Sequence, residues 1–555
     1  MKIAKILIVA AVCLGIAWTV KTAVFSEKGP AAGTTRSAPK PGVAMASNAW
    51  QVPFDVNQTT PPPSPTPTPP PTQTDWLNFG WQTFVALNWP AVSQVPSPSQ
   101  GQPDVSQSIG AVASNGALLP TVWLTYRDLS TVMLVNGADP GQPYSTNVPL
   151  PSNCGAIGSN PVAPGFQPMF IDGSTWGTFQ HPESGLRKDY VNQASNNPLV
   201  SQNGWYTIAD ILLDQSEYTY IQQNGYFKGL KQVADMKASG ELRPFPRTGS
   251  ASDFSPPVTL PSYAQYGALE VKATWRVLDP VKDQNVIPRY YTQWGYFRQL
   301  SGSCNGPTLF GLVALHILRL TPTTPGTWFW ATFEQVDNTS GGNPSLAVSG
   351  TPNGNCSASG PGSPYNVGPA LVTTDVPWNN SNTADNICQV TTIPANVQNV
   401  NQSWQQQLKG TVWQYYQMDN TLNPCPSGTL PCYTFPPLQD QGNQVNTADL
   451  ANTAVESYFQ QTTDKPPKPT SCMSCHGFAD AQGTPSPFTG TNQIFTFVLQ
   501  NAYNPIPSLE TQKLLKTFRA PGASKIALPK GNAVSDGDGH QRSKKPGSDV
   551  RRAPQ

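Results

Sequence analysis

The residues best suited to carry chemistry lie late in the chain, where Cys472, Cys475 and His476 belong to the sequence Cys-Met-Ser-Cys-His. Two thiols at this spacing can form thioethers to the two vinyl groups of one haem, and the adjacent imidazole can then bind the iron. A thioredoxin-like dithiol would need a βαβ setting, and a zinc knuckle would need two more ligands nearby. The spacing therefore predicts one covalent haem c per chain, with His476 as the proximal ligand.

The residues after this motif do not supply the second axial ligand. In a small soluble cytochrome c the motif stands near the start of the domain, and a methionine ligand follows it. Here no methionine follows Met473, and the only later histidine is His540 in a polar tail. The sixth ligand therefore comes from the upstream chain, or that side of the iron is open.

Few upstream residues could bind the iron. His316 lies in the apolar run LFGLVALHILRL and is expected to be buried, either as a hydrogen-bonded core residue or as a distal ligand. His181 lies in the loop sequence QHPESG, where we expect more exposure. Met133 and Met418 could supply a thioether, although a methionine among aromatic residues usually packs in the core.

Two carboxylates are further candidates. Glu270 lies in ALEVKATW and Glu334 in FWATFEQV, both of which have the composition of aromatic strands. Each is either a paired charge on a strand or a group that handles protons beside the haem. Together with His316, they are the candidate catalytic residues.

Short apolar-aromatic runs between turn-forming residues predict the elements that position these groups. The predicted strands are Val122–Tyr126, Gly267–Leu278, Tyr290–Leu300, Leu309–Leu320 and Trp328–Val336. Helical spacing predicts helices over Trp76–Leu87, Thr447–Gln461, Asn492–Asn501 and Ser508–Phe518. Frequent prolines disfavour long helices, so we predict an α+β, strand-rich body with a few short helices and the haem motif near the C-terminal ones. It is not an isolated small cytochrome c fold.

The N-terminus indicates export. Lys2 and Lys5 precede an uncharged apolar run at residues 6–20, which also contains Cys13. This order is typical of a signal peptide, but no good small-x-small site follows closely, so residues 1–25 are either a signal peptide or an N-terminal anchor in the inner membrane. Both alternatives predict a periplasmic protein.

The rest of the chain divides by composition. Residues 26–74 are a Pro-rich linker, in which PPPSPTPTPPP at residues 61–71 favours a stiff polyproline II spacer. Residues 75–519 are the folded, haem-binding body, with the haem segment at about 447–519. Residues 520–555 mix charges with Gly and Ser, which predicts a disordered tail.

Six other cysteines are expected to form three disulfides, because their number is even and the chain is exported. They are Cys154, Cys304, Cys356, Cys388, Cys425 and Cys432. Fifteen pairings are possible in principle. The closest pair in sequence, Cys425 with Cys432, is the simplest assignment.

Composition excludes two classes of protein. Charged residues make up 12% of the chain and the formal net charge is +1, so no field attracts nucleic acid. The 15 Trp, 18 Tyr and 21 Phe supply more apolar surface than a disordered chain carries.

Three segments resemble a known family. They are FVALNWP at Phe84–Pro90, GLVALHILRLTPTTPGTWFWATFEQVDN at Gly311–Asn338, and the late CMSCH. Together they resemble the large exported bacterial proteins described as cytochrome c family proteins, over most of residues 75–519. The resemblance implies one covalent haem on Cys472 and Cys475, with His476 as proximal ligand, in a periplasmic redox protein. It implies no particular substrate.

Two main hypotheses follow. The first is an electron carrier that exchanges electrons with a partner protein and has no substrate of its own. The second is a haem-dependent oxidoreductase, a peroxidase or oxygenase, whose open distal site is formed by the upstream domain. Chain length favours the second, whereas the absence of a recognisable catalytic constellation in the sequence favours the first. A third hypothesis is a protein whose haem only senses ligands or redox state.

Overall fold

The computed structural model describes residues 48–58, 71–95, 99–134, 136–141, 144, 149–173, 190–191, 198–324, 328–340, 344–347, 375–387, 389, 392–423, 432–433, 445–446, 450–457 and 496–503. Several predictions concern residues outside these ranges: the apolar run at 6–20, His181, the pairing of Cys425, the haem-binding Cys472, Cys475 and His476, the helix at Ser508–Phe518, and the tail at 520–555.

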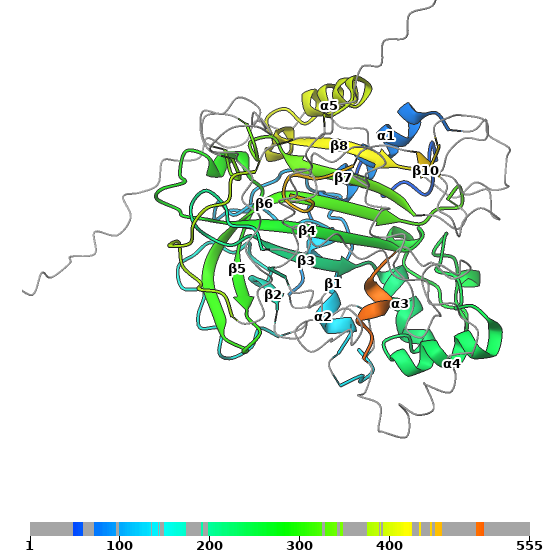
Figure 1. Cartoon of the computed structure of the whole chain (residues 1–555). Coiled ribbons are helices and arrows are strands. Elements are labelled where there is room, and N and C mark those ends of the chain that lie inside the picture. The colour runs from blue at the N-terminus through cyan, green and yellow to red at the C-terminus, as the bar shows by residue number, and fades with distance from the viewer. Residues whose placement is uncertain are drawn as a thin grey trace, which may run out of the picture. The chain divides into compact units, whose positions relative to one another are not determined.

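Eight strands form one large sheet (Figure 1). Its main path runs through β1 (Arg127–Asp128), β3 (Ile208–Leu213), β4 (Leu269–Leu278), β6 (Cys304–Arg319), β5 (Thr292–Arg298) and β2 (Met169–Asp172). β7 (Phe329–Gln335) pairs with β6, and β8 (Tyr416–Leu422) pairs with β7. In this sheet β2 and β5 are parallel and the other pairs are antiparallel. A separate pair joins β9 (Cys432–Tyr433) to β10 (Val445–Asn446).

The long strand β6 is the centre of the sheet. One of its edges pairs with β4 through residues 309–319. The other edge pairs with β5 through residues 304–311 and then with β7 through residues 314–319. The four predicted strands that correspond to β4, β5, β6 and β7 are confirmed, and so is the strand-rich α+β body.

Helix α1 (Gln73–Leu87) covers one face of the sheet, which we call the apolar face. It begins with a capping box, in which Thr72 and Asp75 satisfy each other's backbone N–H groups. Its buried Phe84 stacks on Phe333 of β7, with ring centroids 4.2 Å apart. The periodicity that predicted a helix at Trp76–Leu87 therefore reflects packing on this face.

Two predicted elements were wrong, and a third is helical only over a short 3-10 turn. Val122–Tyr126 contains a 3-10 helix at Trp123–Thr125 instead of a strand, and the buried Trp123 indole donates to Asn88 Oδ1 at the end of α1. The described part of the helix predicted at Thr447–Gln461, residues 450–457, forms turns. The described part of the helix predicted at Asn492–Asn501 is a 3-10 helix at Val498–Asn501.

The sequence patterns missed several helices. Of these, α3 (Gln215–Asn224) and α4 (Gly229–Ser239) lie together at one end of the sheet, and α5 (Ala395–Gln407) lies beside β8 (Figure 1). The short α2 is Leu129–Val132. Further 3-10 helices are Ala251–Asp253, Ser262–Ala264, Ile287–Arg289 and Val412–Tyr415.

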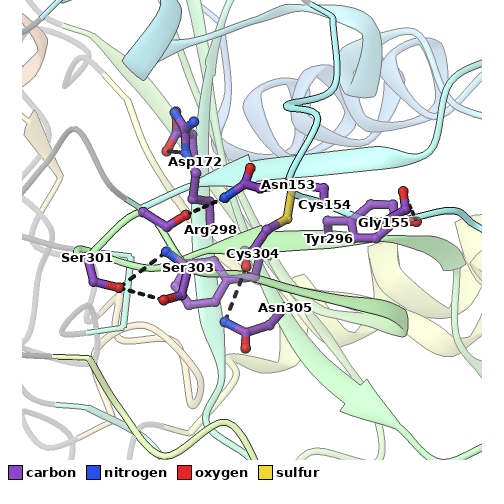
Figure 2. The surroundings of a disulfide bond; sticks show 12 residues. Asn153, Cys154, Gly155, Asp172, Tyr296, Arg298, Ser301, Ser303, Cys304 and Asn305 are labelled. Atoms are coloured by element: carbon purple, nitrogen blue, oxygen red, sulfur yellow. Dashed lines mark hydrogen bonds and ion pairs between the residues drawn. A yellow bond between two sulfur atoms is a disulfide. The ribbon is translucent and has the colours of Figure 1, made fainter.

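A disulfide joins Cys154 to Cys304, the first residue of β6, across a separation of 150 residues (Figure 2). Beside it, the Asn153 side chain donates to the Gly302 carbonyl at 2.9 Å. The pairing of Cys425 with Cys432 stays a prediction, since residues 424–431 lie outside the described ranges.

All described residues belong to one compact unit. Val52 and Val56, from the region predicted to be a linker, are buried in its main core. Among the described helices, none combines the length and the apolar character needed to cross a membrane.

Candidate functional site

The face of the sheet opposite α1 carries polar side chains, and we call it the polar face. Lys272 on β4 lies opposite His316 on β6, which in turn lies opposite Thr332 on β7. Directly opposed residues of antiparallel strands share a face, and every second residue of a strand returns to it. Glu270 on β4 and Glu334 on β7 therefore belong to the polar face as well.

A β-bulge adds a third acid to this face. Met418 and Asn420 of β8 pair with consecutive residues of β7, so Asp419 between them is an extra residue. A bulge re-aims a side chain. Asp419 is buried near Glu334, whose charge helps to raise its pKa, whereas the neighbouring Met418 lies in the aromatic core.

Residues 450–457, which we call the strap, cover the Glu334–Asp419 pair. The Asn452 side-chain amide donates to Asp419 Oδ2 at 3.0 Å and to Thr332 Oγ1 at 3.3 Å. The Thr453 backbone N–H donates to Glu334 Oε2 at 3.2 Å, and the Thr453 hydroxyl donates to the same oxygen. The strap is thus bound to the sheet through these two carboxyl groups and also through the Phe333 carbonyl, which accepts from Asn452 at 3.1 Å.

His316 is buried on the polar face as a neutral imidazole. Burial, with a smaller effect from the charge of Lys272, lowers the pKa of His316 to about 3. Its Nε2 lies 3.7 Å from Glu456 Oε2 of the strap, but a neutral imidazole forms no ion pair at this distance. No described residue hydrogen-bonds to this nitrogen. Burial of His316 is therefore confirmed, and its ring offers a free nitrogen.

The acids of the polar face favour the protonated state. Burial raises the pKa of Glu456 to about 7. Burial also raises the pKa of Glu334, against the hydrogen bonds from Thr453 and Gln417 that lower it. For Asp419, burial and then the nearby charge of Glu334 raise the pKa well above its usual range. This face can hold protons near neutral pH.

Glu270 lies in a second acidic group. The Thr496 hydroxyl donates to Glu270 Oε2 at 2.5 Å. Burial, followed by the charges of Glu270 and Asp214, raises the pKa of Glu217 on α3 well above its usual range. Residues after Thr496 are held by α4, where the Gln232 amide donates to the Leu499 carbonyl at 3.0 Å.

These contacts locate the two ends of the segment that contains the haem motif. The strap ends at Ser457, and residues 458–471 separate it from Cys472. Residues 477–495 separate His476 from Thr496. Since the strap contacts Glu334 and Thr496 contacts Glu270, the segment leaves and rejoins the described fold on the polar face.

The two candidate methionines lie elsewhere. Met418 is buried in the main core, where its pairing with Phe333 places it on the apolar face. Met133 is also buried in this core. Among the candidate iron ligands in described ranges, His316 is the one that the strand register places on the face where the motif-bearing segment is anchored. Within the described ranges, no group of three or more His, Cys, Asp or Glu could hold a metal ion.

Sequence reasoning missed Asp419, Glu456 and Glu217. Asp419 stands beside Met418 in WQYYQMDN, but the bulge that turns it to the polar face leaves no mark in the sequence. Glu456 was assigned to a helix that is a turn. Glu217 occupies the first turn of α3, where an acid is usual and draws no attention.

Comparison with known proteins adds no assignment: no family model, no curated protein and no solved structure matches the chain.

Proposed function

We propose that the protein is an exported, periplasmic monohaem c-type cytochrome that transfers electrons to or from a partner protein. The observation that carries this proposal is the sequence CMSCH, in which Cys472 and Cys475 would hold the haem and His476 would be the proximal ligand. A haem bound there supplies reversible one-electron chemistry.

On the polar face, the described residues offer one side chain that could bind the haem iron. His316 is a buried, neutral imidazole, and its Nε2 has no hydrogen-bond partner among the described residues. A neutral imidazole nitrogen is the form that binds iron. His316 is therefore our candidate for the sixth ligand, and a low-spin, six-coordinate iron would suit an electron carrier.

The polar face also favours a second function. A peroxidase or oxygenase needs groups that hold and release protons beside an open iron site. Glu334 and Glu270 lie on the face where the motif-bearing segment is anchored, and burial raises the pKa of Glu334. In this alternative His316 would act as an acid–base group and leave the iron open.

Mass spectrometry and optical spectra test these proposals. The mature chain should carry one covalent haem, and Cys475→Ser should weaken or abolish its attachment. A chain without haem mass would refute both functions.

Spectra with carbon monoxide separate the two functions. A low-spin spectrum that becomes high-spin in His316→Ala supports the carrier with His316 as ligand. A high-spin wild-type haem that binds carbon monoxide at once supports the oxidoreductase.

A further inference from the structure

Strand β8 lies at an edge of the large sheet. It pairs with β7 on one side, and no described strand pairs with its other side. The free edge of a sheet presents unpaired backbone N–H and C=O groups, to which a strand of another chain can bind. Proteins usually block such an edge with charged side chains, proline, a bulge or a covering element.

The residues of β8 protect only part of this edge. Asp419 is the one charged residue in Tyr416–Leu422, and the strand contains no proline. The Asp419 side chain is turned to the polar face, where its Oδ2 accepts from Asn452 of the strap at 3.0 Å. The bulge at Asp419 interrupts the edge at that point. The stretch Tyr416–Met418 before the bulge therefore depends on a covering element.

Helix α5 covers this stretch with side chains that take the place of a paired strand (Figure 1). Asn401 Nδ2 donates to the Met418 carbonyl at 2.8 Å, and Asn401 Oδ1 accepts from the Met418 N–H at 3.1 Å. A paired strand would make the same two bonds to Met418. Gln405, four residues further along α5, donates from Nε2 to the Tyr416 carbonyl at 2.9 Å.

The spacing of these contacts follows from the geometry of the two elements. In a strand, backbone groups that point to one edge recur every two residues, over about 6.6 Å. In a helix, side chains four residues apart lie on one face and are separated by about 6 Å along the axis. Since Asn401 contacts Met418 and Gln405 contacts Tyr416, α5 runs antiparallel to β8 with a matching step.

α5 is a polar helix that contributes few buried side chains. Val397 and Asn401 are its buried residues, and Trp404 stacks on Trp81 with ring centroids 6.1 Å apart. Its N-cap residue, Pro394, makes no side-chain hydrogen bond to the first turn. Asn and Val have low helix propensity, so α5 depends on these tertiary contacts. It should therefore open locally at a lower free-energy cost than the central strands.

We propose that α5 is a displaceable cover of the β8 edge, and that the uncovered edge pairs with the β8 edge of a second copy of the chain. An antiparallel contact between two identical edges is self-complementary, because each copy supplies the same donors and acceptors. No charged side chain of β8 opposes this approach, since Asp419 is buried on the polar face. The surface does not involve the haem motif and is independent of the proposed function.

Hydrogen exchange in the wild-type, full-length chain tests the cover. The Met418 N–H is bonded to the Asn401 side chain, so its exchange should follow the opening of α5. It should exchange at least about tenfold faster than the amides of Leu315 and Ile317 in the centre of β6. Equal exchange rates would show that α5 opens only together with the sheet, which would overturn the proposal.

A proline on the exposed side of α5 should open the cover without removing a side-chain contact to β8. Gln402 is exposed next to Asn401. Gln402→Pro should raise the uncovered fraction about 100-fold, because proline breaks the helix interior. Self-association, measured by sedimentation over a range of protein concentrations, should then strengthen at least about tenfold relative to the wild type. Gln402→Ala is the matched control: alanine favours the helix, so its association should be no stronger than that of the wild type.

Hydrogen exchange in Gln402→Pro also identifies the surface that associates. The Met418 amide should be protected at high protein concentration and exchange fast after dilution. A variant that stays monomeric while Met418 exchanges fast would refute the pairing, as would association that leaves Met418 unprotected or that is equally strong in Gln402→Ala. If Gln402→Pro does not fold, the wild type gives the same test in the urea range where Met418 exchanges fast and β6 does not. Absence of association there would refute the pairing.

Discussion

The two faces of the sheet differ in the side chains that the same strands place on them. On the apolar face, Phe333 of β7 meets Phe84 and Trp81 of α1, with centroid distances of 4.2 and 5.0 Å. On the polar face, the next residue, Glu334, meets Asp419 and the strap. Burial of these aromatic rings stabilises the fold. Buried acids cost stability unless they are hydrogen-bonded, which makes the acids of the polar face candidates for a function.

The largest effect is expected on the apolar face. Phe84→Ala should lower the free energy of unfolding by about 3–5 kcal/mol, because it leaves a cavity among Phe333, Trp81 and Trp413. Urea unfolding followed by tryptophan fluorescence measures this change. A loss well below 1 kcal/mol would show that this face is not the main source of stability.

On the polar face, removal of the acid should cost less and depend on the substitute. Glu334→Ala leaves the donors of Thr453 and Gln417 without an acceptor and should cost about 1–3 kcal/mol. Glu334→Gln retains an acceptor and should cost less in the same urea experiment. Equal losses for the two variants would mean that the carboxyl group itself matters here, because Gln keeps both the side-chain volume and one acceptor oxygen.

The third prediction concerns pH. The pKa of Glu456 is raised from 4.5 to about 7 on folding, so this group stabilises the fold less as pH rises through that interval. In the wild type, this effect should lower the free energy of unfolding by about 2 kcal/mol between these pH values, allowing for partial solvent access. Glu456→Gln should abolish this decrease. His316 acts in the opposite direction. Because folding lowers its pKa from 6.5 to about 3, it reduces the free energy of unfolding as pH falls through that interval.

Thermal unfolding at several pH values, compared between the wild type and Glu456→Gln, isolates the contribution of Glu456. Since His316 is present in both proteins, its effect cancels to first order. Identical pH profiles would contradict the assignment of a proton to Glu456.

The smallest effect is expected where the motif-bearing segment rejoins the fold. Thr496→Val removes the hydroxyl that donates to Glu270 and should cost about 1 kcal/mol. Limited proteolysis should show faster cleavage near residue 496, while Thr332→Val on the strap side should leave that site unchanged. No difference between the two variants would mean that this hydrogen bond does not anchor the segment.

The sequence predicted the parts of the fold that repeat a simple pattern. β6 and α1 have apolar residues at the periods of a strand and of a helix. It failed at α5, where the helix is built mainly from Gln and Asn and few apolar residues mark its buried side. The strap was predicted as a helix, but Asn452 and Glu456 accept from local backbone N–H groups, and the Asn452 amide also donates to Asp419 of the sheet.

The site was predictable only in part, for physical reasons. Burial of His316 follows from its apolar neighbours in sequence. Its position next to Glu456, and that of Asp419 next to Glu334, depend on a bulge and on contacts between residues far apart in the chain. Glu334 was correctly singled out as an unusual acid in an aromatic strand, but its partner could not be found without the sheet register.

The disulfide between Cys154 and Cys304 has a consequence for the unfolded chain. It closes a covalent loop that contains β2, β3, β4 and β5 together with α3 and α4. Because the loop spans 150 residues, the cross-link removes much of the freedom that these strands would gain on unfolding, which in the chain-entropy account is worth about 4–5 kcal/mol. An oxidising compartment therefore supports the half of the sheet that carries Glu270 and Lys272.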